Sequence, residues 1–140
     1  MPWLDLLPHQ PPMRLLEDVV SIGPGREAVA ARLAKPDDFY FQGHFPGDPV
    51  VPAVILVEMV AQVGGLAAGV PSAGEEPRPR QLRVAAIGPF KFPAPARPGA
   101  RLEASARVAG SLGGLHKIDG AVTADGIVVA SGSLTLAGLA

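Results

Sequence analysis

The sequence predicts an α+β domain in which an antiparallel sheet wraps around one apolar helix. Three observations lead to this prediction. The segment from Ala53 to about Val70 has the length and composition of a buried helix, strand-like segments lie on both sides of it, and Asp125-Gly126 marks a hairpin near the end. This order of elements does not by itself fix the topology of the sheet.

Two strands are expected before the helix. Residues 13–22 are apolar and rich in β-formers, Gly23-Pro24-Gly25 is a turn signal, and residues 26–35 read as a second strand. A loop with four prolines then covers residues 36–52. Long loops in compact domains are functional or disordered. This one favours order because it holds four aromatic side chains, Phe39, Tyr40, Phe41 and Phe45.

The helix is expected over residues 53–70. Pro52 suits its first turn and Gly69 suits its end. Its residues are apolar almost all the way round, so we expect it to be buried. A membrane span is the alternative, but Glu58 and Gln62 lie in the middle of the segment, and a charge at the centre of a bilayer is costly.

Four strands are expected after the helix, beyond a polar connection at residues 72–80. One of them alternates polar and apolar residues, which is typical of a half-buried strand. Turns at Gly113-Gly114 and Asp125-Gly126 separate the last three. The four strands cover residues 81–92, 101–108, 115–124 and 127–136. We find no repeats and treat residues 1–140 as a single domain.

The composition narrows the possible functions. Of the 140 residues, 48% are hydrophobic and 18% are charged, so the chain has more apolar surface than one subunit can cover and we expect an oligomer. A net charge of −1 gives no basic excess for nucleic acid. The absence of cysteine excludes disulfides and thiolate chemistry. The first residues lack a signal-peptide pattern, so a cytoplasmic protein is expected.

Basic residues are unevenly distributed along the chain. A local cluster of this kind forms either a solvated basic face or a docking patch for an acidic partner. Both interpretations stay open at this point. The cluster consists of Arg78, Arg80, Arg83, Lys91, Arg97 and Arg101.

The helix carries the first candidate for chemistry. Glu58 and Gln62 are its strongly polar residues, and their i, i+4 spacing places both on one face. An ionised carboxylate in apolar surroundings is costly unless it is paired or protonated, and a protonated carboxyl group can act as a general acid. Glu58 is therefore either a general acid or a structural residue with a buried partner.

The loop before the helix carries the second candidate. His44 lies between Gly43 and Phe45 in a segment stiffened by prolines. Imidazole titrates near neutral pH and is the usual group for proton transfer, although a packed loop histidine bonded to backbone is the alternative. The start of the helix adds unpaired N–H groups at residues 53–55, which can stabilise an oxyanion. Base, acid and oxyanion donor together suit proton abstraction beside a thioester carbonyl.

Residues 42–62, with the sequence QGHFPGDPVVPAVILVEMVAQ, resemble the central motif of the 3-hydroxyacyl-acyl carrier protein dehydratases of the FabZ type. The motif is specific because the glutamate follows the histidine by fourteen residues and the glutamine follows four later. The resemblance covers nearly the whole chain. It extends to Leu7-Pro8-His9 with Pro12, to residues 15–19 and to residues 91–99.

This resemblance implies a hot-dog fold, in which a curved antiparallel sheet wraps around one long helix. It implies that His44 takes the C2 proton of a (3R)-3-hydroxyacyl thioester and that Glu58 protonates the departing hydroxyl, with no bound cofactor or metal. It also implies substrate-binding roles for Ala53, whose N–H holds the thioester oxygen, for Gln62, which orients Glu58, and for Phe45 and Gly47.

The resemblance further implies the partners. The substrate is carried on the phosphopantetheine arm of acyl carrier protein, an acidic protein that suits the basic cluster. The resemblance also implies a homodimer, often a trimer of dimers, in which His44 of one subunit faces Glu58 of the other. The family motif usually has glycine where this chain has Ala53, and the added methyl group narrows the approach to that N–H.

Two other functions fit the same fold. A thioesterase would use the carboxylate and the oxyanion donor to activate water, and a non-catalytic acyl-binding subunit would need a partner chain. The presence of both His44 and Glu58 favours the dehydratase. The other histidines, His9 and His116, are expected to be structural and exposed respectively, and without an acidic cluster they make a weak metal site.

Overall fold

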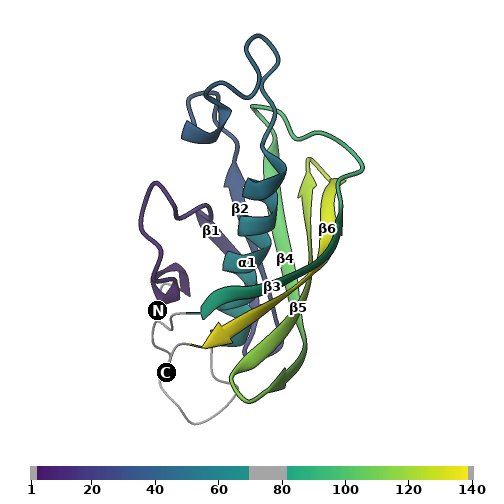
Figure 1. Cartoon of the computed structure of the whole chain (residues 1–140). Helices are drawn as coiled ribbons and strands as arrows, with labels where there is room; N and C mark the ends of the chain where they lie inside the picture. Colours follow the sequence, from purple (N-terminus) through teal and green to yellow (C-terminus); the bar gives the residue numbers. More distant parts are fainter. Residues whose placement is uncertain (1–2, 70–81, 139–140) are drawn as a thin grey trace.

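The computed structural model describes residues 3–69 and 82–138, in which one long helix packs against a six-stranded sheet (Figure 1). This arrangement confirms the predicted α+β architecture. In chain order the elements are the 3-10 helix η1 (Trp3–Leu6), the strands β1 (Asp18–Gly23) and β2 (Glu27–Leu33), the 3-10 helix η2 (Phe39–Phe41), the helix α1 (Ala53–Gly69), and the strands β3 (Leu82–Lys91), β4 (Arg101–Leu112), β5 (Leu115–Ala124) and β6 (Ile127–Gly138).

The sheet has the strand order β1-β2-β4-β5-β6-β3, and all neighbours are antiparallel. The β5–β6 hairpin turns at Asp125 and Gly126, which both have positive φ, as a two-residue hairpin of this type requires. Strands β1 and β3 form the two edges. Because β3 crosses over to pair with β6, the sheet extends on both sides of α1 and curves around it (Figure 1).

The first strand is shorter than predicted. We expected it to begin at residue 13, but β1 begins at Asp18. Residues 7–17, here called the N-terminal strap, run beside α1 without regular structure (Figure 1). The reason is a contact with the distant helix: the side chain of Gln62 donates to the carbonyl of Met13 and accepts from the N–H of Leu15, so these backbone groups are not available to pair with a strand.

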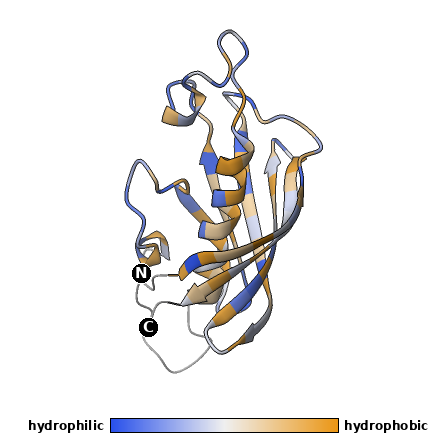
Figure 2. Ribbon diagram, viewed as in Figure 1, coloured by the Kyte–Doolittle hydropathy of each residue, from blue (hydrophilic) through white to orange (hydrophobic). Residues whose placement is uncertain are grey.

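Two glycines bring α1 close to β5. A Cβ atom at Gly120 would lie 2.6 Å from Cγ1 of Val60, and one at Gly64 would lie 3.0 Å from Cγ2 of Ile118. Most of the residues in α1 itself are hydrophobic (Figure 2). The second half of the helix is buried accordingly, and Val60 and Val63 are fully enclosed.

The first turn of α1 is not covered in the same way. Val54 is 74% exposed, and the rings of Phe45, in the preceding loop, and Phe92, just after β3, are also exposed. The prediction of a buried helix is therefore correct for the C-terminal part of α1. It is wrong for the first turn, because no other element of the described chain covers that turn. Among the described residues, no helix is long and apolar enough to cross a membrane.

Candidate active site

Glu58 lies in the second turn of α1 and points toward the N-terminal strap. Its side chain is 28% exposed. Oε2 accepts a hydrogen bond of 2.9 Å from Nε2 of Gln62, one helical turn further on, which is the contact that the i, i+4 spacing predicts. The carboxyl group is therefore half-buried and held on one side.

Gln62 is fully buried and joins α1 to the strap. Its Nε2 also donates to the carbonyl of Met13 at 2.7 Å, and its Oε1 accepts from the N–H of Leu15 at 2.9 Å. Because a backbone N–H can only donate, the amide oxygen of Gln62 must face the N–H of Leu15. The amide nitrogen of Gln62 must then face Glu58. The backbone of the strap thus fixes the donor that holds the carboxyl group.

His9 also meets this carboxyl group, which the sequence did not indicate. Its Nε2 lies 3.6 Å from Oε2 of Glu58. Both side chains line a pocket of about 300 Å³ between the strap, α1 and β3, together with Ala61 and residues 82–84. We expected a structural role for His9. Only its place in the Leu7-Pro8-His9 motif sets it apart in the sequence, and its partner Glu58 is 49 positions away.

His44 lies in the loop between η2 and α1. Its Nδ1 is 3.2 Å from the carbonyl oxygen of Val50, and the N–H of Val50 donates back to the carbonyl of His44 at 2.9 Å. A ring nitrogen that bonds a carbonyl must carry a proton, so this contact leaves Nε2 of the neutral ring with a free lone pair. The ring also stacks on Phe45, with centroids 4.2 Å apart.

The rest of this loop turns tightly and is tied to a neighbouring segment. Phe45 and Asp48 exchange backbone hydrogen bonds, and Gly47 between them has a φ of +76°, which favours glycine. The carboxylate of Asp48 pairs with the guanidinium of Arg97. These contacts hold the His44 loop against residues 93–98.

The start of α1 opens into a third part of the site. Ala53 is exposed at the wall of an apolar pocket of about 290 Å³. Its N–H has no intrahelical acceptor because it is the first residue of the helix. Other walls of the pocket are Val50, Val51, Leu56, Phe92 and Val129.

The two proposed catalytic side chains do not meet within one chain. In the part of the chain that the structure describes, no hydrogen bond or ion pair joins His44 to Glu58. His44 contacts Val50 and Phe45, whereas Glu58 contacts Gln62 and His9. The residues that the sequence predicts for the site therefore lie apart within one chain, His44 in the loop and Glu58 in the helix, and their catalytic roles stay a prediction.

Comparison with known proteins decides the family. The FabA-like domain family matches residues 7–133. The chain is 37% identical over 125 residues to the 3-hydroxyacyl-[acyl-carrier-protein] dehydratase FabZ of Anaeromyxobacter sp., a match that covers 89% of this chain and 80% of that protein. It is 35% identical over 133 residues to the enzyme of the same name from Roseiflexus castenholzii, with 94% and 90% covered. The chain belongs to the FabZ family of dehydratases.

Solved structures agree on the fold of this FabZ-family chain. The dehydratase heterocomplex ApeI:P from Xenorhabdus doucetiae superposes with a TM-score of 0.79 at 18% identity, covering 100% of this chain and 92% of that chain. The E. coli PaaI protein of the phenylacetic acid degradation operon superposes with a TM-score of 0.64 at 16% identity, covering 86% and 81%. The predicted hot-dog fold is confirmed.

A polar network that the sequence did not indicate anchors the loop of this FabZ-family chain. Asp38 accepts hydrogen bonds of 2.7 Å from Arg32 on β2 and from the hydroxyl of Tyr40, and one of 2.9 Å from the N–H of Lys35. Burial alone would raise the pKa of Asp38, but these bonds outweigh burial and lower the pKa. Burial and the bond to Asp38 raise the pKa of Tyr40.

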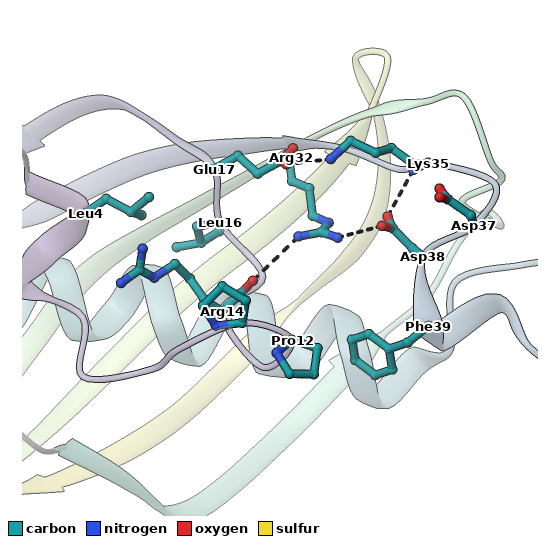
Figure 3. Close-up of a pocket in the computed structure, with 11 residues that line it drawn as sticks. Leu4, Pro12, Arg14, Leu16, Glu17, Arg32, Lys35, Asp37, Asp38 and Phe39 are labelled. Atoms are coloured by element: carbon teal, nitrogen blue, oxygen red, sulfur yellow. Dashed lines mark hydrogen bonds and ion pairs between the residues drawn. The ribbon is translucent and has the colours of Figure 1, made fainter.

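Figure 3 shows the contacts of Asp38 with Arg32 and Lys35 on the wall of a pocket between the strap and β2. Lys35 pairs with Glu17 at 2.7 Å, so the charges along this wall neutralise one another. No pattern in the sequence indicates the network, because Arg32 and Asp38 lie on either side of the predicted boundary between strand and loop. The network serves to fix the start of the loop that carries His44.

The basic cluster is only partly described. Arg78 and Arg80 lie outside the described residues. Arg97 is paired with Asp48, and Arg101 lies 3.8 Å from Glu103. Arg83 and Lys91 are exposed on the edge strand β3. A docking patch for acyl carrier protein therefore stays a prediction.

Proposed function

We propose that this FabZ-family chain dehydrates (3R)-3-hydroxyacyl chains on acyl carrier protein to trans-2-enoyl chains in fatty acid biosynthesis, as a hydro-lyase. The observation that carries the proposal is the buried Gln62 that holds Glu58, in a chain 37% identical to a 3-hydroxyacyl-[acyl-carrier-protein] dehydratase. A carboxyl group held at one oxygen is arranged to exchange a proton at the other.

His44 is proposed as the base. Its Nδ1 is engaged with Val50, so Nε2 is the nitrogen that accepts the C2 proton of the substrate. The N–H of Ala53, at the wall of the apolar pocket, is proposed to hold the thioester oxygen as negative charge develops on it. Phe45 stacks on the imidazole and, with the turn at Gly47, shapes the entrance for the thioester.

Glu58 is proposed as the acid. As His44 takes the C2 proton, the C3–O bond breaks, its electron pair leaves with the oxygen, and the proton of Glu58 converts the departing hydroxyl into water. The electrons of the C2–H bond become the C2=C3 double bond. The imidazolium and the carboxylate that remain return to their starting states when the proton passes from His44 to Glu58 through solvent.

We propose that each active site is shared between two subunits of a homodimer. His44 and Glu58 of one chain keep separate partners, so a second copy is needed to bring a histidine to each glutamate. The first turn of α1 and the rings of Phe45 and Phe92 are exposed apolar groups, and a second subunit is proposed to cover them. Acyl carrier protein is the proposed partner that delivers the substrate.

The test is the reversible hydration of a short trans-2-enoyl thioester, followed by the absorbance of the conjugated enoyl group. Wild type is compared with Glu58→Gln, and Glu27→Gln, which removes an exposed carboxyl group on β2, is the matched control. We expect turnover by wild type and by the control, and a loss on the order of 10²–10⁴ in Glu58→Gln.

Three outcomes would overturn the proposal. Release of free thiol from an acyl thioester would identify a thioesterase. No turnover of wild type on carrier-protein and coenzyme A substrates alike would identify an acyl-binding subunit. Full activity of Glu58→Gln would remove the proposed acid from the mechanism.

A further inference from the structure

His9 lies at a fixed point of the N-terminal strap. The Nε of Arg14 donates to the carbonyl of His9 at 3.1 Å, and the N–H of Arg14 donates to the carbonyl of Gln10 at 3.0 Å, so residues 9–14 form a closed turn. Arg32 reaches the carbonyl of Arg14 from β2, as Figure 3 shows. Gln62 holds the same turn from α1 through Met13. The backbone that carries His9 is thus tied to both the sheet and the helix.

The imidazole of His9 makes one polar contact. Its Nδ1 is buried and has no hydrogen-bond partner among the described residues, whereas its Nε2 lies 3.6 Å from Oε2 of Glu58. Leaving a buried nitrogen without a partner has a cost. A histidine is favoured at this place over an apolar residue only if the contact of its other nitrogen offsets that cost.

The two oxygens of Glu58 have different surroundings. Oε2 faces two nitrogens, Nε2 of Gln62 at 2.9 Å and Nε2 of His9 at 3.6 Å. Oε1 has no such partner within residues 3–69 and 82–138. The second distance is longer than an ordinary hydrogen bond, and contacts of this kind tighten when substrate fills a site.

We infer that His9 is a positioning residue for Glu58, which acts with Gln62 to hold Oε2 and so leaves Oε1 to deliver the proton to the departing hydroxyl. The inference rests on the proposed dehydratase function. His9 itself does not touch the reacting atoms in this scheme. Its effect is to fix the rotation of the carboxyl group, which Gln62 alone leaves free to swing about a single hydrogen bond.

The experiment compares His9→Leu with His9→Gln in the enoyl hydration assay. Leucine keeps the bulk and removes the donor, whereas glutamine keeps a donor. We expect kcat of His9→Leu to fall by on the order of 10-fold or more, with KM unchanged within about twofold, because the lost contact acts on the proton transfer and not on substrate binding. His9→Gln should recover most of the loss. Gln10→Ala, in the same turn, should behave like wild type.

A double variant shows whether His9 acts through Glu58. If it does, His9→Leu adds nothing in a Glu58→Gln background, because no carboxyl group is left to position. The double variant should then be as active as Glu58→Gln alone. Multiplying effects in the double variant would overturn the inference, since they would mean that His9 acts independently of Glu58.

Thermal unfolding of each variant separates positioning from folding. A loss of activity that follows only a loss of folded protein, with an unchanged kcat for the folded fraction, would overturn the inference. So would wild-type kcat in His9→Leu while Glu58→Gln is inactive, and in that case the dehydratase proposal would stand. An inactive wild type, or an active Glu58→Gln, would instead contradict the proposed function itself.

Discussion

Gln62 donates a hydrogen bond of 2.9 Å to Glu58 while the backbone of the N-terminal strap fixes the orientation of the same amide. The position of the candidate acid is therefore set by residues more than forty positions earlier in the chain. Gln62 is also fully buried, so the polar link between strap and helix runs through the core. The position of the candidate acid and the stability of the core therefore both depend on this one side chain.

Replacing Gln62 by leucine should lower both stability and activity. The change leaves Leu15 N–H and Met13 O without their partner in a buried setting, so we expect a loss of about 2–4 kcal/mol in the free energy of unfolding. Urea denaturation measures it. Gln42→Leu, at an exposed glutamine, is the control and should change stability by less than about 0.5 kcal/mol. A stable Gln62→Leu would contradict a structural role for this amide.

Mixing two inactive variants should restore activity if the active sites are shared. In a mixed dimer of His44→Ala and Glu58→Gln, one site carries both changes and the other carries neither. Random mixing makes about half of the dimers mixed, so recovery of about a quarter of wild-type activity is expected for an interface with twofold symmetry. The variants are unfolded and refolded together before the assay. No recovery, with mixed dimers present by mass spectrometry, would place both residues of a site in one chain.

Asp38 should contribute stability that is lost in acid. Its pKa in the folded state lies below the ordinary value of 3.8, so the contribution is fully present above about pH 4 and disappears as pH falls through the lower pKa of the folded state. Asp38→Asn should therefore be less stable than wild type at pH 7 by about 1.5–3 kcal/mol. The difference should shrink at pH 3.

Urea denaturation at the two pH values measures this difference, with Asp37→Asn at the exposed neighbour as the control. Equal differences at pH 7 and pH 3 would mean that the ionised carboxylate is not the source of the stability. The His44 loop begins at this network, so the variant should also show lower activity at pH 7 than its folded fraction accounts for.

A methyl group at residue 120 should disturb the contact between α1 and β5. A Cβ there meets Cγ1 of Val60 at 2.6 Å and the carbonyl oxygen of Ser105 at 2.8 Å, and the backbone oxygen cannot move aside. Gly120→Ala should cost about 1–3 kcal/mol of unfolding free energy. Gly110→Ala, on β4 with nothing within 4 Å of the added atom, is the matched control. Equal thermal midpoints for the two variants would show that the helix can move away from β5 without cost.

Much of the fold follows from local patterns in the sequence. The apolar run that begins at Ala53 predicts α1, and Asp125-Gly126 predicts the last hairpin, because helix periodicity and turn chemistry act over a few neighbouring residues. The same reasoning fails for residues 13–17. Their composition favours a strand, but a side chain from α1 takes the backbone groups that a strand would pair, and no local pattern reports that contact.

The contacts of the candidate site are likewise of two kinds, those within one element and those between separate elements. The spacing of Glu58 and Gln62 is local to one helix, so their contact could be predicted from the sequence. Three other features follow from the packing of separate elements: His9 lies beside Glu58, Asp38 binds both Arg32 and Tyr40, and His44 lies apart from Glu58 within one chain. The physical reason is that such contacts depend on how separate elements pack, and packing is fixed by the whole core and not by residues adjacent in the chain.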